Sequence, residues 1–279
     1  MITVPEGFGK ALGERADEWV ASLPKLATKA CSRWRLTPDG PLMNGMCAIV
    51  LPVRQADGHR AALKITWVGT ETENEPLALR VYNGEGAVRL LDHDEELGAL
   101  LLERLDHTHS LDDEPIDKAI GVICGLLRRH RDLTAPAEIR RFEGELRDHP
   151  AIPRELFAAA RDVADNRTMG TTLVNEDLHF QNVLRGDREP WLMIDPKPLS
   201  GDREYSVIPL LWNRFDELDG QKGLTDRFLA ICDAAELDVA KARDWTLCRA
   251  VANWVWCLEE DLEDFAGFCA EIARWAART

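Results

Sequence analysis

The sequence has no long apolar run, no excess of positive charge and no paired cysteines, and each absence excludes a class of protein. No stretch approaches the roughly 18 to 20 apolar residues that span a bilayer, and residues 1–10 lack the apolar core of a secretory signal. We therefore expect a cytoplasmic protein without a membrane partner. The net charge of -15 argues against nucleic acid as a partner, because phosphate backbones bind basic surfaces. The seven cysteines are scattered without a C-x2-C pair, which favours reduced thiols over a disulfide framework or a zinc site.

What is present is an ordinary globular composition with one notable polar motif. The chain has 279 residues, 45% of them hydrophobic, enough for one large or two small domains. Asp177 is followed five residues later by Asn182, and Asp195 closes the short apolar run 191–194. This is the order of a kinase catalytic loop, in which the Asp takes a hydroxyl proton while the Asn and the second Asp hold magnesium. The alternative is a surface turn, where Asp and Asn are common.

A lysine on an expected strand is the candidate for binding nucleotide phosphates. Alternation along 61–65 puts Lys64 on one face and its two apolar neighbours on the other. The alternative is a solvent-facing lysine on a half-buried strand. A kinase-like Lys64 needs an acidic partner on the following helix. We expect Glu75, at the helix entrance before Pro76, and Glu71 stays a rival.

Two further nucleotide contacts are expected from chain order alone. Backbone groups near Glu103 and Leu105, at the end of the expected sheet, are the candidates for a hinge that hydrogen-bonds adenine. The segment 43–46 stands where a glycine-rich phosphate loop belongs, but it contains only Gly45, so the G-x-G-x-x-G fingerprint is absent.

The order of expected elements predicts an α+β fold with two lobes. The first lobe, 1–103, combines N-terminal helix with a small antiparallel sheet and one inserted helix; the second, 104–279, is mainly helical and carries the catalytic loop and acceptor site. This arrangement is protein-kinase-like and requires a cleft between the lobes. The expected strands are 46–53, 60–67, 87–91, 98–102, 172–174, 182–184 and 191–194. The expected helices after the first thirty-odd residues are 76–82, 116–129, 155–166, 207–218, 224–235 and 240–262.

An acidic run near the C-terminus is the candidate acceptor site. Glu259, Glu260, Asp261 and Asp264 are expected at the end of a helix, where negative charge opposes the helix dipole. Together with Glu176, beside the expected base, they would bind a cationic acceptor through charge-assisted hydrogen bonds. The alternative is a solvated polar helix face.

The segments 56–64, 88–94 and 101–105, and most strongly 177–196, carry a resemblance to a known family. Over nearly the whole chain, from residue 19 to 256, the sequence is similar to the aminoglycoside phosphotransferase family, in particular its streptomycin 6-kinase and hydroxyurea phosphotransferase branch. It implies an ATP- and Mg²⁺-dependent kinase that phosphorylates a hydroxyl of streptomycin and so gives antibiotic resistance. Asp177 would then be the base, Lys64 would hold ATP phosphates, and Asn182 and Asp195 would bind magnesium.

The sequence departs from the family pattern at Asn175, Glu176, Gln181 and Ser206, none of which is an expected base or metal ligand. Two other functions stay open. One is a kinase for another small hydroxylated molecule, such as a different aminocyclitol, a sugar or a hydroxyurea-like compound. The other is a non-catalytic kinase relative, which usually lacks the lysine, the base or a metal ligand, whereas all are present here.

Overall fold

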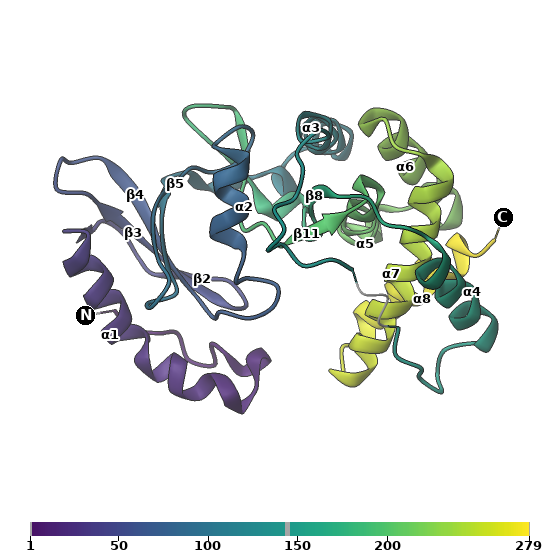
Figure 1. Ribbon diagram of the computed structural model, residues 1–279, viewed down its shortest axis with the longest axis horizontal. Helices are drawn as coiled ribbons and strands as arrows, with labels where there is room; N and C mark the ends of the chain where they lie inside the picture. Colours follow the sequence, from purple (N-terminus) through teal and green to yellow (C-terminus); the bar gives the residue numbers. More distant parts are fainter. Residues whose placement is uncertain (1, 143–145, 279) are drawn as a thin grey trace. The chain divides into compact units, whose positions relative to one another are not determined.

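The computed structural model describes residues 2–142 and 146–278. The chain forms two compact units, one made of Met1–Thr108 with Leu184–Ile194 and the other of His109–Val183 with Asp195–Thr279 (Figure 1). The mixed α+β class and the kinase-like order of elements agree with the expectation from sequence. In the described part of the chain, no helix is both long and apolar enough to cross a membrane.

The two units differ from the expected division at 103/104, because the first unit extends to Thr108 and also includes a segment from late in the sequence, Leu184–Ile194. The backbone N–H of Val88 donates to the carbonyl of Met193, and Met193 donates to Gly86. Arg188 of the same segment pairs with the Glu103 carboxylate at 3.0 Å. These contacts fix 184–194 against the first unit, although Arg188 is 85 residues from Glu103 and 101 residues from Ala87 in sequence.

The first unit is a twisted antiparallel sheet between two helices. Its strands follow the order β1-β3-β4-β6-β5, with β2 also paired to β3. Their bounds are β1 Thr37–Pro38, β2 Met43–Asn44, β3 Ala48–Arg54, β4 Arg60–Thr66, β5 Leu90–Asp94 and β6 Ala99–Glu103. The hairpin between β3 and β4 turns at Asp57-Gly58, where Gly58 has φ 90°, a conformation that costs glycine little. The sequence predicted this hairpin correctly.

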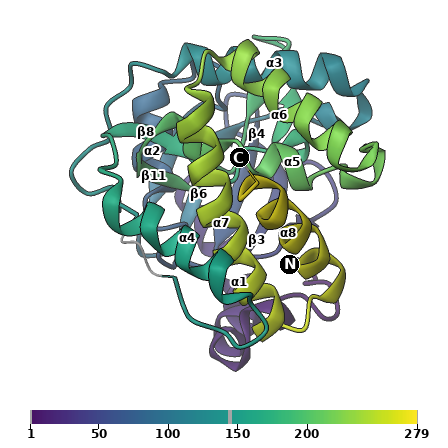
Figure 2. The same ribbon diagram turned by 90° about the vertical axis from the view of Figure 1, so that its right-hand side faces the viewer.

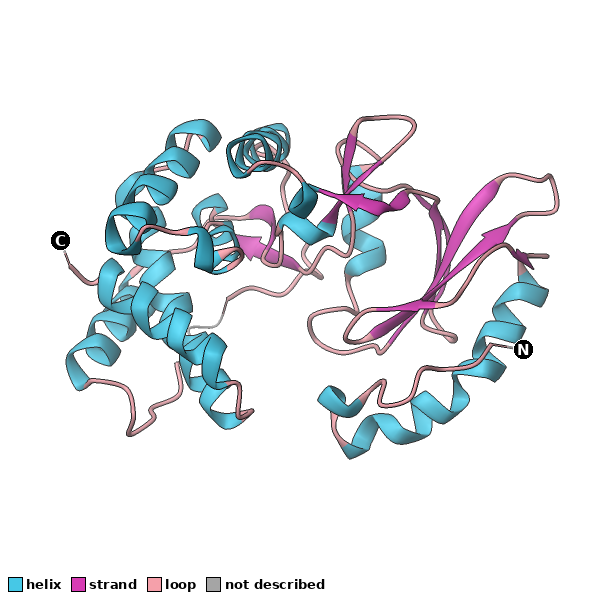
Figure 3. Ribbon diagram, turned by 180° about the vertical axis from the view of Figure 1, so that it is seen from behind, coloured by secondary structure: helices cyan, strands magenta, loops and turns pink. Residues whose placement is uncertain are grey.

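The two helices cover opposite faces of the sheet (Figure 1 and Figure 3). Helix α1, Asp17–Arg33, buries Leu23 and Ala27 against Leu63 and Ile65 of β4. Helix α2, Glu75–Tyr82, places Leu79 against Ala62 and Leu100 on the other face. Because side chains alternate along a strand, Lys64 lies on the α2 face with Ala62. The expected alternation at Lys64 is therefore confirmed.

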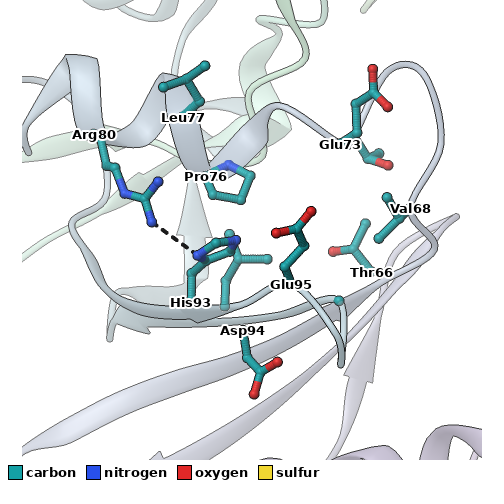
Figure 4. Close-up of a pocket in the computed structure, with 12 residues that line it drawn as sticks. Thr66, Val68, Glu73, Pro76, Leu77, Arg80, His93, Asp94 and Glu95 are labelled. Atoms are coloured by element: carbon teal, nitrogen blue, oxygen red, sulfur yellow. Dashed lines mark hydrogen bonds between the residues drawn. The ribbon is translucent and has the colours of Figure 1, made fainter. Parts of the chain in front are cut away.

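A pocket of about 300 Å³ lies between α2 and the ends of β4, β5 and β6. Arg80 of α2 and His93 of β5 point toward each other there, with Nη2 and Nδ1 3.0 Å apart (Figure 4). Neither Lys64 nor Glu75 lines this pocket. It is therefore distinct from the pair that the sequence links to nucleotide binding.

The second unit is built around the long helix α7, Val239–Glu259, which packs against α8, Glu263–Ala276, on one side and α4, Arg154–Asn166, on the other (Figure 2). The remaining helices are α3 Ile116–Arg129, α5 Pro209–Trp212 and α6 Gly220–Ala235. Strands β8, Thr172–Asn175, and β11, Pro198–Gly201, form an antiparallel pair. A further sheet, most of whose residues belong to the first unit, joins β7 Asp106–Ser110, β9 Val183–Arg185 and β10 Trp191–Met193 in the order β10-β9-β7.

Several expected elements are wrong in extent. The expected helix over 207–218 is reduced to α5 and a short 3-10 turn, because Arg214 adopts a left-handed conformation with φ 55°. The expected strand 87–91 lies three residues later, as β5, because Ala87 and Val88 bond instead to the segment around Met193. The expected helix 240–262 ends at Glu259, and α8 was not expected.

Candidate active site

The expected base lies on a loop that directly follows a buried strand. Strand β8 ends at Asn175, and its side-chain oxygen Oδ1 accepts the backbone N–H of Asp177 at 3.0 Å. Five residues on, the side-chain Nδ2 of Asn182 donates to the carbonyl of Asp177 at 3.1 Å. These two hydrogen bonds thus make the segment from Asp177 to Asn182 a compact loop rather than a loose surface turn. With its nitrogen anchored, Asn182 has its oxygen, Oδ1, to offer to a cation.

The second candidate metal ligand, Asp195, comes two residues after the end of β10. Its φ of 49° is left-handed, a conformation that costs a non-glycine residue roughly 1–3 kcal/mol and that is concentrated at functional sites. The oxygen of Asn182 and the carboxylate of Asp195 are hard donors. They are the kind of ligand that Mg²⁺ prefers, together with water and phosphate oxygens.

A residue that the sequence analysis missed contacts the expected base. The Nζ of Lys197 lies 2.5 Å from Oδ2 of Asp177. Lys197 is 20 residues further along the chain and reaches Asp177 because β11 pairs with β8. The only sequence signal is a lysine between two prolines directly after Asp195, and this pattern alone does not identify its partner.

His179, two residues after Asp177, provides no positive charge to this loop at neutral pH. Burial lowers the pKa of His179, and this effect outweighs the opposing influence of the Asp177 and Asp195 carboxylates. A lowered pKa keeps the imidazole neutral until the solution becomes more acidic than usual for histidine. Its Nδ1 is buried without a hydrogen-bond partner among the described residues. In the part of the chain that the structure describes, the cation that contacts Asp177 is therefore Lys197.

The four departures from the family pattern all make contacts that hold the loop. Asn175 supports Asp177 as described, and its carbonyl accepts a hydrogen bond from the hydroxyl of Ser206 at 3.2 Å. Gln181 donates to the carboxylate of Asp112 at 3.0 Å. Glu176 forms an ion pair with Arg140. These residue types therefore fit the local structure of this chain.

Helix α7 fixes the same loop from behind. The guanidinium of Arg249, a buried residue, donates to the carbonyls of Glu176 and Tyr205 at 2.9 and 2.8 Å. It also lies 4.4 Å over the ring of Tyr205. A rigid helix thus supports the residue next to Asp177, which is the kind of support that a precisely placed catalytic group needs.

In the first unit, Lys64 pairs with Glu75 rather than with Glu71. Both carboxylate oxygens of Glu75 lie 2.7 Å from Nζ of Lys64, and both side chains are buried, with 5% and 1% exposure. Glu71 is exposed. Glu75 begins α2, with Pro76 in the first turn, where a fixed φ and a missing N–H are tolerated. The preferred partner at the helix entrance is thus the one observed.

The expected hinge and phosphate loop have simple local structures. The backbone N–H of Glu103 donates to the carbonyl of Arg89, and its carboxylate pairs with Arg188. The Glu103 N–H is therefore engaged within the first unit, whereas its neighbour Leu105 lies just after β6 and is buried. Gly45 closes a tight turn between β2 and β3 by donating to Ala48.

The acidic run does not lie at the end of one helix, which corrects the expected dipole argument. Glu259 ends α7, Asp261 is left-handed with φ 55°, and Glu263 and Asp264 begin α8. Acidic side chains in a first helical turn are stabilising. All of the run is exposed, and Glu259 pairs with Arg147 at 2.6 Å. These carboxylates therefore lie at a helix-to-helix junction, and no contact within residues 2–142 and 146–278 brings them together with Asp177.

A sheet-containing unit with a buried Lys-Glu pair, combined with a mainly helical unit that carries an Asp-Asn-Asp set, defines a phosphotransferase of kinase-like fold. A solved aminoglycoside phosphotransferase, a thermostable mutant in ternary complex with AMP-PNP and hygromycin B, has the same fold, with a TM-score of 0.60 at 15% identity over 88% of this chain and 95% of that one. Residues 33–261 match the model of the aminoglycoside/hydroxyurea antibiotic resistance kinases. The chain belongs to that family.

Two curated relatives match almost the whole chain. It is 38% identical to a streptomycin 6-kinase of Streptomyces griseus, a match that covers 99% of this chain and 98% of the relative. It is 40% identical to a hydroxyurea phosphotransferase of Kitasatospora aureofaciens, which covers 93% of this chain and 79% of the relative. The enzyme class inferred from the Asp-Asn-Asp motif, a small-molecule kinase, is thereby confirmed.

Proposed function

We propose that this kinase transfers the γ-phosphoryl group of ATP to a hydroxyl of streptomycin or a closely similar aminoglycoside, and so inactivates the antibiotic in the cytoplasm. The observation that carries the proposal is the loop in which Asn175 and Asn182 hold Asp177 in place. Asp195 follows this loop in sequence, shortly before β11. The similarity to streptomycin 6-kinase over nearly the full length of both chains supports the choice of acceptor.

The first unit would bind the nucleotide. Lys64 would hold ATP phosphates, and Glu75 would keep its ammonium group in position, because a buried lysine needs a paired charge. Backbone groups around Glu103 and Leu105 would bind adenine. Since the N–H of Glu103 is already used, the N–H of Leu105 is the better donor candidate.

The second unit would provide the base and the metal ligands. The Asp177 carboxylate would accept the proton of the acceptor hydroxyl while that oxygen bonds to the γ-phosphorus. The bond between this phosphorus and the bridging oxygen breaks, and ADP leaves with the electron pair. Asn182 and Asp195 would hold Mg²⁺, which neutralises charge on the phosphate oxygens when bound.

The acceptor would be a polycation bound by carboxylates. Glu259, Glu260, Asp261 and Asp264 are exposed and able to accept hydrogen bonds from guanidinium or ammonium groups. The indole of Trp256, 37% exposed on the last turns of α7, adds an aromatic surface beside them. The Glu176 carboxylate is already paired with Arg140, so it would bind an acceptor only in competition with that arginine.

Single neutralising variants test the acidic run. Glu259→Gln, Glu260→Gln, Asp261→Asn and Asp264→Asn should raise the acceptor KM, with at least one position costing about 1.5 to 3 kcal/mol of binding. The KM for ATP should stay constant. Asp165→Asn, which removes an exposed carboxylate from α4, is the matched control and should change neither constant. If all four variants bind streptomycin as the parent does, the run is a solvated surface.

A panel of acceptors tests the substrate. ADP release would be measured with streptomycin, other aminocyclitols, simple sugars and hydroxyurea, each against a control without acceptor. The proposal requires streptomycin-dependent release at micromolar to millimolar acceptor, the usual KM range. Phosphorylation of hydroxyurea instead would favour the second candidate function, which rests on the similarity to the hydroxyurea phosphotransferase. Nucleotide binding without release for any acceptor would indicate a non-catalytic relative.

A further inference from the structure

Lys197 is the cation that contacts the proposed base, and three features hold it there. Its backbone N–H donates to Oδ1 of Asn175 at 3.0 Å, the same oxygen that accepts the N–H of Asp177. Its carbonyl accepts the N–H of Glu176 at 3.0 Å. Its Nζ reaches Oδ2 of Asp177. One asparagine side chain thus ties the backbones of both members of the ion pair together.

The local sequence restricts Lys197 further. Pro196 and Pro198 flank it, and each proline fixes its own φ. Pro198 also restricts the backbone of Lys197 to extended conformations. Pro198 begins β11, which pairs with Asn175 of β8, so the lysine leaves the sheet beside the catalytic loop. Little backbone freedom is left for the lysine to lose when its side chain engages Asp177.

A carboxylate that acts as a base needs such a contact because its last torsion is soft. The χ2 angle of an aspartate is broad and nearly twofold, so the backbone does not set the direction of the oxygens. Fixing Oδ2 on Lys197 leaves Oδ1 as the oxygen that can face an acceptor hydroxyl. Phosphoryl transfer to a hydroxyl that lies about 1 Å from its productive position can be roughly 10²-fold slower.

We infer that Lys197 is a positioning residue, which orients the Asp177 carboxylate toward the acceptor hydroxyl. The inference rests on the proposed kinase function and adds a residue to it. The ion pair is partly exposed, with 21% and 28% exposure of the two side chains, so its contribution to stability is small. Its effect should therefore be seen in turnover.

Four variants would be compared in acceptor-dependent ADP release. Lys197→Met keeps the aliphatic stem, removes the charge and should lower kcat about 10- to 100-fold, with the KM for ATP nearly unchanged. Lys197→Arg should recover part of the loss. In the Asp177→Asn background, Lys197→Met should cause no further loss, because there is no longer an anionic base to orient. Lys222→Met breaks an exposed ion pair of the same length, 2.5 Å with Asp226, and should be silent.

The outcomes separate this inference from the proposed function. Full kcat in Lys197→Met, or losses that multiply in the double variant, would overturn the positioning role. If Lys197→Met fails to fold, as shown by thermal unfolding, the kcat values of the arginine variant and of the double variant still test the positioning role. A parent that transfers to no acceptor but hydrolyses ATP would refute the proposed acceptor, and the same comparison would then be made on transfer to water. A parent with neither reaction overturns both.

Discussion

The buried pair between Lys64 and Glu75 allows stability and nucleotide binding to be tested separately. Removing one member takes away the ion-pair partner that the other has at 2.7 Å, and both side chains are buried, with 5% and 1% exposure. Breaking a buried pair from one side typically costs about 3–5 kcal/mol. We therefore expect Glu75→Gln to lose about this much free energy of unfolding, a large part of the stability of an ordinary protein.

Replacing both members should restore much of the stability. An apolar pair of similar volume is often as stable as a buried ion pair, or more stable. Lys64→Met combined with Glu75→Leu should therefore be closer to the parent than Glu75→Gln is. The same double variant should still fail to transfer phosphoryl groups, because the ammonium group for the ATP phosphates is gone.

Urea unfolding followed by circular dichroism and tryptophan fluorescence provides the measurement. The matched control is Lys118→Met, which breaks an exposed pair of the same 2.7 Å length with Glu114 and should cost no more than about 1 kcal/mol. A loss in Glu75→Gln as small as in this control would refute the reasoning. So would a double variant less stable than Glu75→Gln.

Three further predictions concern the second unit. Asp177→Asn should reduce turnover about 10² to 10⁴-fold and leave nucleotide affinity by calorimetry unchanged; near-normal turnover would remove Asp177 from the mechanism. Asp195→Asn, which keeps a residue that tolerates the left-handed backbone, should lose most Mg²⁺-dependent turnover without a shift in thermal unfolding, and the parent should lose activity on chelation. Burial raises the pKa of the Cys124, Cys232 and Cys248 thiols to about 12, so they stay neutral and unreactive toward a thiol reagent at mildly alkaline pH. These three should react only after unfolding, whereas Cys31 and Cys47 are half-buried and should be labelled earlier. Rapid labelling of the three in the native protein would contradict their burial.

The parts of the fold that could be predicted are those with a strong local pattern. Strands β3 and β4 are two apolar stretches joined by an Asp-Gly turn, and helix α3 has a clear apolar face. Strand β7, by contrast, reads Asp-His-Thr-His-Ser and is mostly exposed, so no hydrophobic alternation marks it. The break between α7 and α8 lies at Asp261. This segment contains no glycine or proline, so the sequence does not mark the end of a helix there.

The candidate site was predictable where a motif lies within one segment, as with Asp177 and Asn182. The choice of Glu75 over Glu71 followed from the proline that marks the helix entrance. Lys197 could not be assigned, because its contact with Asp177 arises from strand pairing between separate segments and has no spacing rule. The acidic run was wrongly expected at the end of one helix, because the left-handed residue that separates the two helices was not recognised.

The most direct test of the central claim is the mass spectrum of streptomycin after incubation with the parent protein, ATP and Mg²⁺. The account predicts a product that carries one additional phosphoryl group, formed with an equal amount of ADP, and no product with Asp177→Asn. The account would be contradicted if the parent is folded and binds ATP but leaves streptomycin unmodified, as the matched Asp177→Asn sample does.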